Sequence, residues 1–168
     1  VVRLGRRALD QAHARGLAVH KETNRRSRET SCYVDHCRDR GQELAALVDS
    51  HTNAQAAFAP WTPGFSIPDG TDIAVNATSV GFHPNADATL DVDTSSFTSG
   101  MVVADVVANP PMTRWLQAAA DAGCTPLTGL GMLVNQALVN AQLWTGQTLN
   151  ADVMHRALQQ ALEIQEKS

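Results

Sequence analysis

The chain of 168 residues lacks the features that mark several special classes of protein. It has no apolar run near the ~18 residues that a membrane span needs, and its first residues contain no apolar segment of a signal peptide. Its net charge of −4 gives no electrostatic reason to expect nucleic acid or an anionic membrane as a partner. With 43% hydrophobic and 18% charged residues, the composition is typical of a globular protein. We expect a single domain in the cytoplasm.

Cysteine is also scarce. The three cysteines, Cys32, Cys37 and Cys124, are an odd number in a chain for which we expect no signal peptide, which argues against a disulfide framework. Cys32 and Cys37 lie near His20 and His36, but their spacing is not that of a CxxC pair and no second pair of ligands follows. We therefore expect free thiols and no metal site.

The N-terminal part of the chain shows little regular pattern. Residues 1–40 are rich in Arg and His and have no sustained apolar period, and only segments 8–17 (helix-like) and 32–34 (strand-like) stand out. Good helix formers follow at 43–48. A small strand is predicted at 54–59, and the Pro- and Gly-rich residues 60–70 predict a loop.

Strands and helices alternate in the rest of the chain. The β-branched run 101–107 is typical of a strand covered on both faces, as in a parallel sheet. Gly123 follows a predicted helix at the position of a left-handed cap. The other predicted segments are a strand at 73–76, a loop at 77–93, an extended piece at 125–127 and helices at 113–122, 131–144 and 151–166. This order predicts an α/β domain with a mostly parallel sheet.

The two C-terminal helices differ in pattern. In the last helix one apolar face is expected to pack on the domain; it consists of Met154, Ala157, Leu158, Ala161 and Leu162. In the helix before it, Gln136 and Asn140 share the face that should be apolar, which consists otherwise of Met132, Leu133, Ala137, Leu143 and Trp144. These amides either satisfy neighbouring backbone groups, or Gln136 points into a cleft and bonds a hydroxylated ligand.

Three short polar side chains follow the predicted strand 73–76. Asn76 ends the strand, and Thr78 and Ser79 come directly after it. Ligands of open α/β sheets bind just beyond the carboxyl ends of the strands. However, Asn, Thr and Ser also build turns without any ligand. The pattern favours neither reading.

Four ordered segments resemble the shikimate (or quinate) dehydrogenase family. Asn76 to Gly81 resembles its NATSxG segment, and Asp105 to Pro110 its D-x-x-Y-N-P segment. Residues 129–136 resemble G-L-x-M-L-V-x-Q, and residues 143–146 are similar to its L-W-T-G. The likeness covers residues 72–153 and implies the Rossmann-like NAD(P)-binding domain of that family, incomplete or degraded at its N-terminal end.

The resemblance implies a reaction and a set of contacts. The family transfers a hydride reversibly between NADP(H) and the 3-dehydroshikimate/shikimate pair of aromatic amino-acid (chorismate) biosynthesis, and the cofactor carries the hard chemistry. Gln136 matches the glutamine that bonds a substrate hydroxyl. The implied cofactor neighbours are Asn76, Thr78, Ser79, Val106, Gly129, Met132 and Leu133. A homodimer or a partner that supplies a substrate domain is expected.

The departures from the family pattern are equally specific. Ala108 stands where the family has a tyrosine that contacts substrate. In the family the catalytic lysine and aspartate belong to an N-terminal substrate domain, which we expect to be absent here, so no catalytic residue is assigned. Of the glycines that a phosphate-binding turn needs, only Gly5 is found. We therefore expect the isolated chain to be inactive, as part of a truncated dehydrogenase.

Asp35 bears on the choice between NAD and NADP. It follows the strand-like segment 32–34, where the family has the Asn of an N-R-T segment. An acid there would favour the ribose hydroxyls of NAD, or Asp35 is an exposed loop acid. We hypothesise that residues 1–40 are strongly diverged or shifted in reading frame. The alternative to an enzyme is a non-catalytic module that binds a nucleotide weakly or serves as an interaction surface.

Overall fold

The computed structural model describes residues 30–35, 38–52 and 54–166, of which 30–35 and 163–166 by their backbone alone. None of the described helices is long and apolar enough to cross a membrane. The elements in chain order are β1 (Thr30–Asp35), α2 (Arg38–His51), β2 (Gln55–Pro60), β3 (Phe65–Ser66), β4 (Ile73–Asn76), β5 (Val92–Asp93), the 3₁₀-helix η1 (Thr94–Ser96), β6 (Val102–Asp105), α3 (Arg114–Asp121), β7 (Thr125–Leu127), α4 (Leu130–Thr145) and α5 (Ala151–Glu166).

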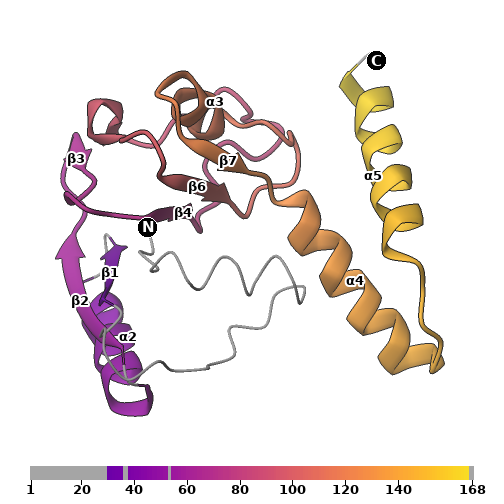
Figure 1. Ribbon diagram of the computed structural model, residues 1–168, viewed down its shortest axis with the longest axis horizontal. Coiled ribbons are helices and arrows are strands. Elements are labelled where there is room, and N and C mark those ends of the chain that lie inside the picture. The colour runs from indigo at the N-terminus through magenta and orange to yellow at the C-terminus, as the bar shows by residue number, and fades with distance from the viewer. Residues whose placement is uncertain (1–29, 36–37, 53, 167–168) are drawn as a thin grey trace.

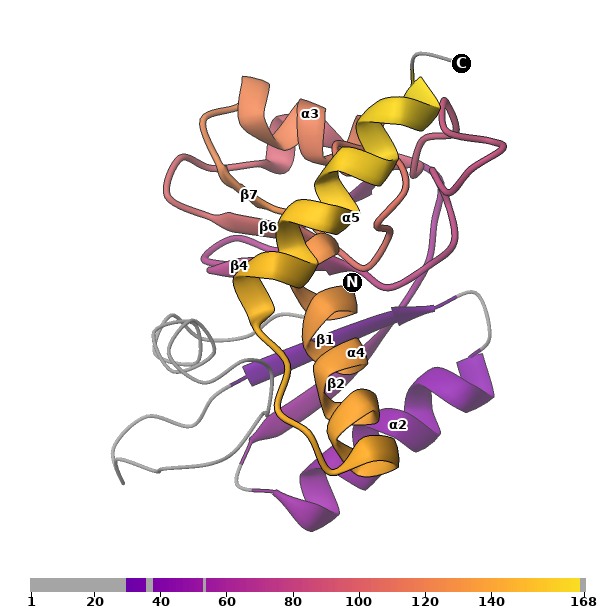
Figure 2. The ribbon, with the colours of Figure 1, turned by 90° about the vertical axis from the view of Figure 1, so that its right-hand side faces the viewer.

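All described strand pairs are parallel. β4, β6 and β7 form one sheet in that order, β1 pairs with β2, and the two-residue strands β3 and β5 pair with each other. Helix α2 lies against the β1–β2 pair and α3 against the β6–β7 side of the larger sheet (Figures 1 and 2). Parallel sheets flanked by helices confirm the predicted Rossmann-like α/β class.

The predicted elements agree with the observed ones to within a few residues. Strand β6 is shorter than the predicted 101–107, and α2 is longer than the predicted 43–48. The short strands β3 and β5 lie inside segments predicted as loops. Two residues per strand are too few to produce an alternating or continuous apolar pattern. The predicted helix at 8–17 lies outside the described residues.

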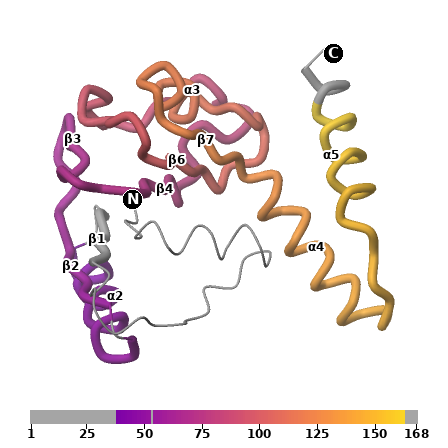
Figure 3. The backbone as a smooth tube through the Cα atoms, in the orientation of Figure 1, coloured from indigo at the N-terminus to yellow at the C-terminus, as the bar shows by residue number. Residues whose placement is uncertain are grey.

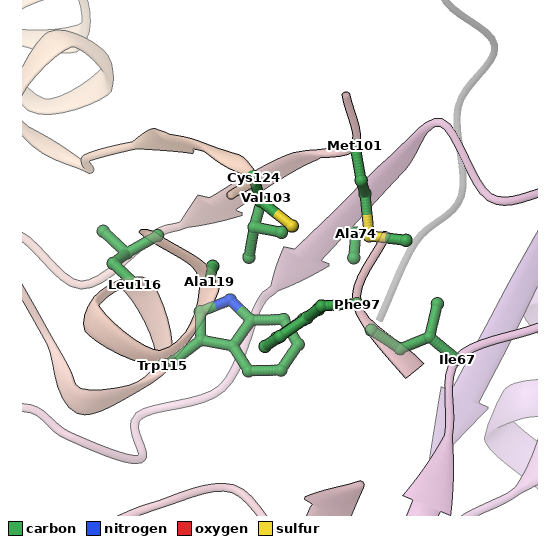
Figure 4. Packing of buried hydrophobic residues seen from close by; sticks show 9 residues of the cluster. All are labelled: Ile67, Ala74, Phe97, Met101, Val103, Trp115, Leu116, Ala119 and Cys124. Atoms are coloured by element: carbon green, nitrogen blue, oxygen red, sulfur yellow. The ribbon is translucent and has the colours of Figure 1, made fainter. Parts of the chain in front are cut away.

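The main core lies between the β4–β6–β7 sheet and α3. Phe97 and Trp115 meet edge to face, with ring centroids 5.1 Å apart, and the Trp115 indole donates a hydrogen bond to the Ala104 carbonyl at 3.1 Å. Figure 4 shows both rings within a cluster that also contains Ile67, Ala74, Met101, Val103, Leu116, Ala119 and Cys124. Burial of the Cys124 thiol raises its pKa, which fits the predicted free thiol.

Helix α3 has well-formed ends. The Thr113 hydroxyl caps its N-terminus by accepting from the Leu116 amide at 3.4 Å. At the other end Gly123 has φ +79°, its amide donates to the Ala120 carbonyl, and the Cys124 amide donates to Ala119. This is a Schellman motif, and it confirms the left-handed cap predicted at Gly123.

The C-terminal helices pack far more loosely. Helix α4 leaves the sheet after β7, and α5 returns beside it (Figure 3). Of the apolar face predicted for α5, Met154, Leu158 and Leu162 are half-buried, whereas Ala157 and Ala161 are exposed. The prediction that this face packs on the domain is therefore only partly correct, because α5 is covered by α4 along no more than a narrow stripe of half-buried residues.

Candidate functional site

The candidate site lies where β4 and β6 end. Three segments follow neighbouring strands at this edge of the sheet: the turn 76–81, the segment 105–110 and the start of α4. The Val106 amide donates to the Asn76 carbonyl at 3.0 Å, which joins the first two segments. Ligands of parallel α/β sheets bind at this carboxyl edge.

Asn76 builds the turn that follows β4. Its side-chain oxygen accepts from the amide (2.9 Å) and the hydroxyl (2.7 Å) of Thr78. Its amide nitrogen donates to the Val80 carbonyl at 3.4 Å and to Asp105 Oδ1 at 3.1 Å. The residue is 1% exposed. Of the two readings that the sequence left open, turn-building therefore describes Asn76.

Of the other two polar residues of the turn, Thr78 builds the turn and Ser79 is available for ligand contact. Thr78 Oγ1 also accepts from the Val80 amide at 3.1 Å, so its hydroxyl stabilises the turn although the residue is exposed. Ser79 is exposed. No described residue hydrogen-bonds to the Ser79 hydroxyl, which leaves it accessible to a ligand.

Asp105 is the residue of this site that sequence reasoning missed. It ends β6, is 4% exposed, and accepts from Asn76, from the Val107 amide (2.9 Å) and from the Thr113 hydroxyl (2.6 Å). A carboxylate at the end of an apolar strand run was the available signal. Because a buried charge is costly without donors, such a residue predicts a set of hydrogen-bond partners.

Gly129 lies at the start of α4, where there is no space for a side chain. Its backbone is helical, with φ −69° and ψ −8°, so any residue could adopt its conformation. However, a Cβ atom there would lie 2.6 Å from the Val107 carbonyl oxygen and 2.8 Å from that of Val106. Only glycine lets α4 begin this close to the segment 105–110.

Comparison with known proteins finds a matching family model and several similar proteins. The family model described as the shikimate 5'-dehydrogenase C-terminal domain matches residues 129–159. Shikimate dehydrogenase (NADP(+)) of Methanopyrus kandleri is 42% identical over 87 residues, which are 52% of this chain and 30% of that protein. The enzyme of the same name from Ruegeria sp. is 37% identical over 114 residues, which are 68% of this chain and 39% of that protein.

The chain carries a C-terminal segment of the shikimate dehydrogenase family. It spans well under half the length of the curated relatives that it matches. Among solved structures, 5-ketofructose reductase of Gluconobacter sp. strain CHM43 matches with a TM-score of 0.70 and 43% identity, over 77% of this chain and 47% of that one. A shikimate dehydrogenase in complex with NADP+ matches with a TM-score of 0.69 and 29% identity, over 78% and 46%.

Two of the three family-derived positions on α4, Leu133 and Gln136, face solvent. The buried side chains of this helix are Leu130 and Val134, whereas Leu133 is 40% exposed and Gln136 is exposed. The expectation that Gln136 and Asn140 lie on an inward-packed face is wrong, because the buried side chains of α4, Leu130 and Val134, lie on another side of the helix. Neither amide is buried, so neither needs a backbone partner.

The remaining predicted residues lie around these segments. Met132 and Val106 are half-buried. Asp35 ends β1 opposite Pro60, and its side chain lies outside the described atoms, as does the phosphate-binding turn expected near Gly5. Among the described residues no group of three His, Cys, Asp or Glu side chains is arranged to hold a metal ion.

An open hollow of about 400 Å³ adjoins the turn 76–81. Its lining combines apolar and polar side chains from the segments after β2 and β4, namely Trp61, Pro63, Val80, Thr89, Leu90 and Asp91. Val80 is its only member from the turn itself. The hollow therefore borders the candidate site without containing the predicted contact residues.

Proposed function

We propose that this chain forms the cofactor face of an NADP(H)-dependent dehydrogenase of a polyhydroxylated carbonyl compound, with the 3-dehydroshikimate/shikimate pair as the first candidate. The observation that carries the proposal is the joining of the turn 76–81, the segment 105–110 and Gly129 at the carboxyl edge of one parallel sheet. The NADP(+)-dependent relatives support the choice of cofactor. Bound NADPH would supply the hydride.

Each segment has a part in this proposal. Ser79 offers a free hydroxyl beside a rigid turn, and Gly129 leaves room where a Cβ atom would fill the space. The Val106 backbone, Met132 and Leu133 would border the nicotinamide, as the resemblance implies. Gln136, exposed on the same helix, would bond a hydroxyl of the substrate.

Two residues of the chain, Asp35 and Arg38, favour different cofactors. Asp35 favours the free ribose hydroxyls of NAD, whereas an arginine nearby favours the phosphate of NADP. Arg38, in the first turn of α2, is exposed and lies three positions after Asp35. We propose NADP as the preferred cofactor and NAD as the weaker one.

A second candidate substrate is 5-ketofructose. Two observations favour it: the 43% identity to 5-ketofructose reductase, and Ala108 in place of the tyrosine that contacts substrate in shikimate dehydrogenases. Both candidate substrates are polyhydroxylated ketones, so the role proposed for Gln136 applies to either. The difference between them lies in the residues that surround the ring or chain.

The first experiment is a titration of the purified chain with NADPH and with NADH, followed by the fluorescence of the reduced nicotinamide. Saturable binding at micromolar concentrations, tighter for NADPH, is expected. The Gly129→Ala variant should bind more weakly, and Gly131→Ala is the matched control because nothing lies within 4 Å of a Cβ atom there. No binding of either nucleotide would favour a non-catalytic module instead.

The second experiment tests the chain for turnover of either candidate substrate. Saturation of the chain with NADPH is followed by addition of 3-dehydroshikimate or 5-ketofructose, and nicotinamide absorbance is recorded. Oxidation of NADPH by one of the two ketones assigns the substrate. Binding of cofactor without turnover would mean that the proton-transferring groups must come from another domain or chain.

A further inference from the structure

Asp105 occupies the centre of a polar network that connects three parts of the candidate site. Oδ1 accepts from Asn76 Nδ2 at 3.1 Å and from the Val107 amide at 2.9 Å. Oδ2 accepts from Thr113 Oγ1 at 2.6 Å. The carboxylate thereby touches the turn after β4, the segment after β6 and the N-cap of α3.

The cost of burying a carboxylate makes its presence informative. An apolar side chain of similar volume would fill the same space without loss of hydration. A carboxylate differs in that it only accepts hydrogen bonds and can receive several donors at fixed angles. All of its partners at Asp105 are donors, and two of them belong to segments that carry predicted cofactor contacts.

We propose that Asp105 is a positioning residue, which couples the turn 76–80 to the segment 105–107 and holds both in the conformation that the cofactor face requires. The coupling runs from Asp105 to the Asn76 side chain and from there to the Thr78 amide, which Asp105 does not touch. Its effect on NADP(H) rests on the proposed function, whereas its effect on the two segments does not.

Substitution by asparagine tests this role with little change of shape. If the new NH₂ group replaces Oδ1, it meets two donors, the Val107 amide and Asn76 Nδ2. If it replaces Oδ2, the Thr113 hydroxyl must accept from it, while also accepting from the Leu116 amide, and its own hydrogen loses its acceptor. Neither orientation satisfies all the donors.

The test is amide hydrogen exchange on the full chain, with Ala119 in α3 as the internal reference. In Asp105→Asn, exchange at Thr78 and Val107 relative to Ala119 should accelerate about tenfold or more, as expected when a buried hydrogen bond is lost. Val103→Ala is the matched control. It lies two positions earlier on β6 with 0% exposure, and should destabilise the domain without changing these ratios.

The reciprocal variant Asn76→Ala keeps the proposal testable if Asp105→Asn does not fold. The Asn76 side chain makes no hydrogen bond to the Val107 amide, but both donate to Asp105 Oδ1. Because coupling between two sites is reciprocal, loss of the Asn76 side chain should loosen Asp105 and so accelerate hydrogen exchange at the Val107 amide. Unchanged protection of Val107 in this variant, or of Thr78 in Asp105→Asn, would overturn the proposal.

NADPH titration of the same variants separates the two proposals. If the unmodified chain binds, Asp105→Asn should weaken binding about tenfold while Val103→Ala leaves the affinity unchanged. Equal affinity of Asp105→Asn and the unmodified chain would overturn the positioning role. If the unmodified chain does not bind NADPH, the proposed function fails, and the exchange ratios still decide the coupling.

Discussion

The β4–β6–β7 sheet with α3 and the α4–α5 pair are packed in opposite ways. In the sheet region, apolar and polar side chains are both buried, and each buried polar group has a partner: Asp105, Asn76 and Thr113 satisfy one another. In the α4–α5 pair, no described side chain of α5 is buried. Leu143 is 76% and Trp144 81% exposed on α4. The comparison shows that the fold is stabilised at the sheet, while the α4 positions predicted to contact ligand belong to a lightly packed helix.

Removal of two tryptophans should show this difference most strongly. Trp115→Ala deletes a buried indole and its bond to the Ala104 carbonyl, so the free energy of unfolding should fall by about 3–5 kcal/mol. Trp144→Ala should change it by less than about 0.5 kcal/mol, as is usual for surface substitutions. Urea denaturation of both variants provides the comparison. A loss above 1 kcal/mol for Trp144→Ala, roughly twice the usual surface effect, would mean that α4 is covered in solution.

Alanine substitution of two glycines near the start of α4 shows where the tightly packed region ends and the loosely packed helix begins. Gly129→Ala pushes a methyl group against two backbone carbonyls and should cost about 1–3 kcal/mol by overpacking. Gly131→Ala meets no atom within 4 Å and should stabilise the helix by about 0.5–1 kcal/mol. Thermal unfolding of the pair measures both effects. Opposite signs are expected, and equal destabilisation would contradict the close approach at Gly129.

Alanine substitution at two left-handed helix caps tests whether the sheet region and the α4–α5 pair unfold together. Gly123 at the end of α3 has φ +79°, and Gly146 at the end of α4 has φ +70°. Alanine at either position should cost about 1–2 kcal/mol locally. For Gly123→Ala the whole cost should appear in the global free energy of unfolding. For Gly146→Ala we expect a smaller global loss and faster amide exchange in α4 and α5. Equal global losses would show that the two regions unfold together.

The smallest effect is expected at Asp93, which caps the N-terminus of the 3₁₀-helix η1. Hydrogen bonds from the Ser95 hydroxyl and then the Ser95 amide lower the pKa of Asp93 below its ordinary value of 3.8. A lowered pKa in the folded state means that the stabilisation is complete above this value and is lost as the pH falls through the folded pKa. The stability difference between the unmodified chain and Asp93→Asn should therefore shrink on acidification from neutral pH. Urea midpoints along that series measure it, and a difference that grows in acid would reverse the sign.

The sequence predicted the fold well where the pattern of apolar residues and a recognisable helix cap occur together. The β-branched run before Asp105 and the Gly123 cap were sufficient for β6 and α3, because burial on both faces and a positive φ each restrict residue choice strongly. The pairing of β3 with β5 was not predicted. It depends on contacts such as the Ser96 hydroxyl accepting from the Ile67 amide, between residues that are distant in the chain.

The sequence indicated where the candidate site lies better than it indicated what each of its residues does. Asn76 was identified, but its amide is engaged by Thr78 and Asp105 and builds the turn. The amphipathic pattern of α4 pointed to the wrong face, because a helix with apolar residues on most sides has no single stripe that periodicity can identify. Gly129 was identified by resemblance, and its steric reason came only from the nearby carbonyls.

Parallel pairing throughout has a consequence for the order of events during synthesis. Ile73 pairs with Val102, and Val102 with Thr125, so no described strand has its partner in an adjacent hairpin. On a ribosome that adds about 5–20 residues per second, β4 leaves the exit tunnel seconds before β6 can reach it. During that interval the apolar strand needs shelter from a chaperone or from its own nascent chain. Yield in cells should therefore respond to translation speed and chaperone supply as well as to the stability of the finished fold.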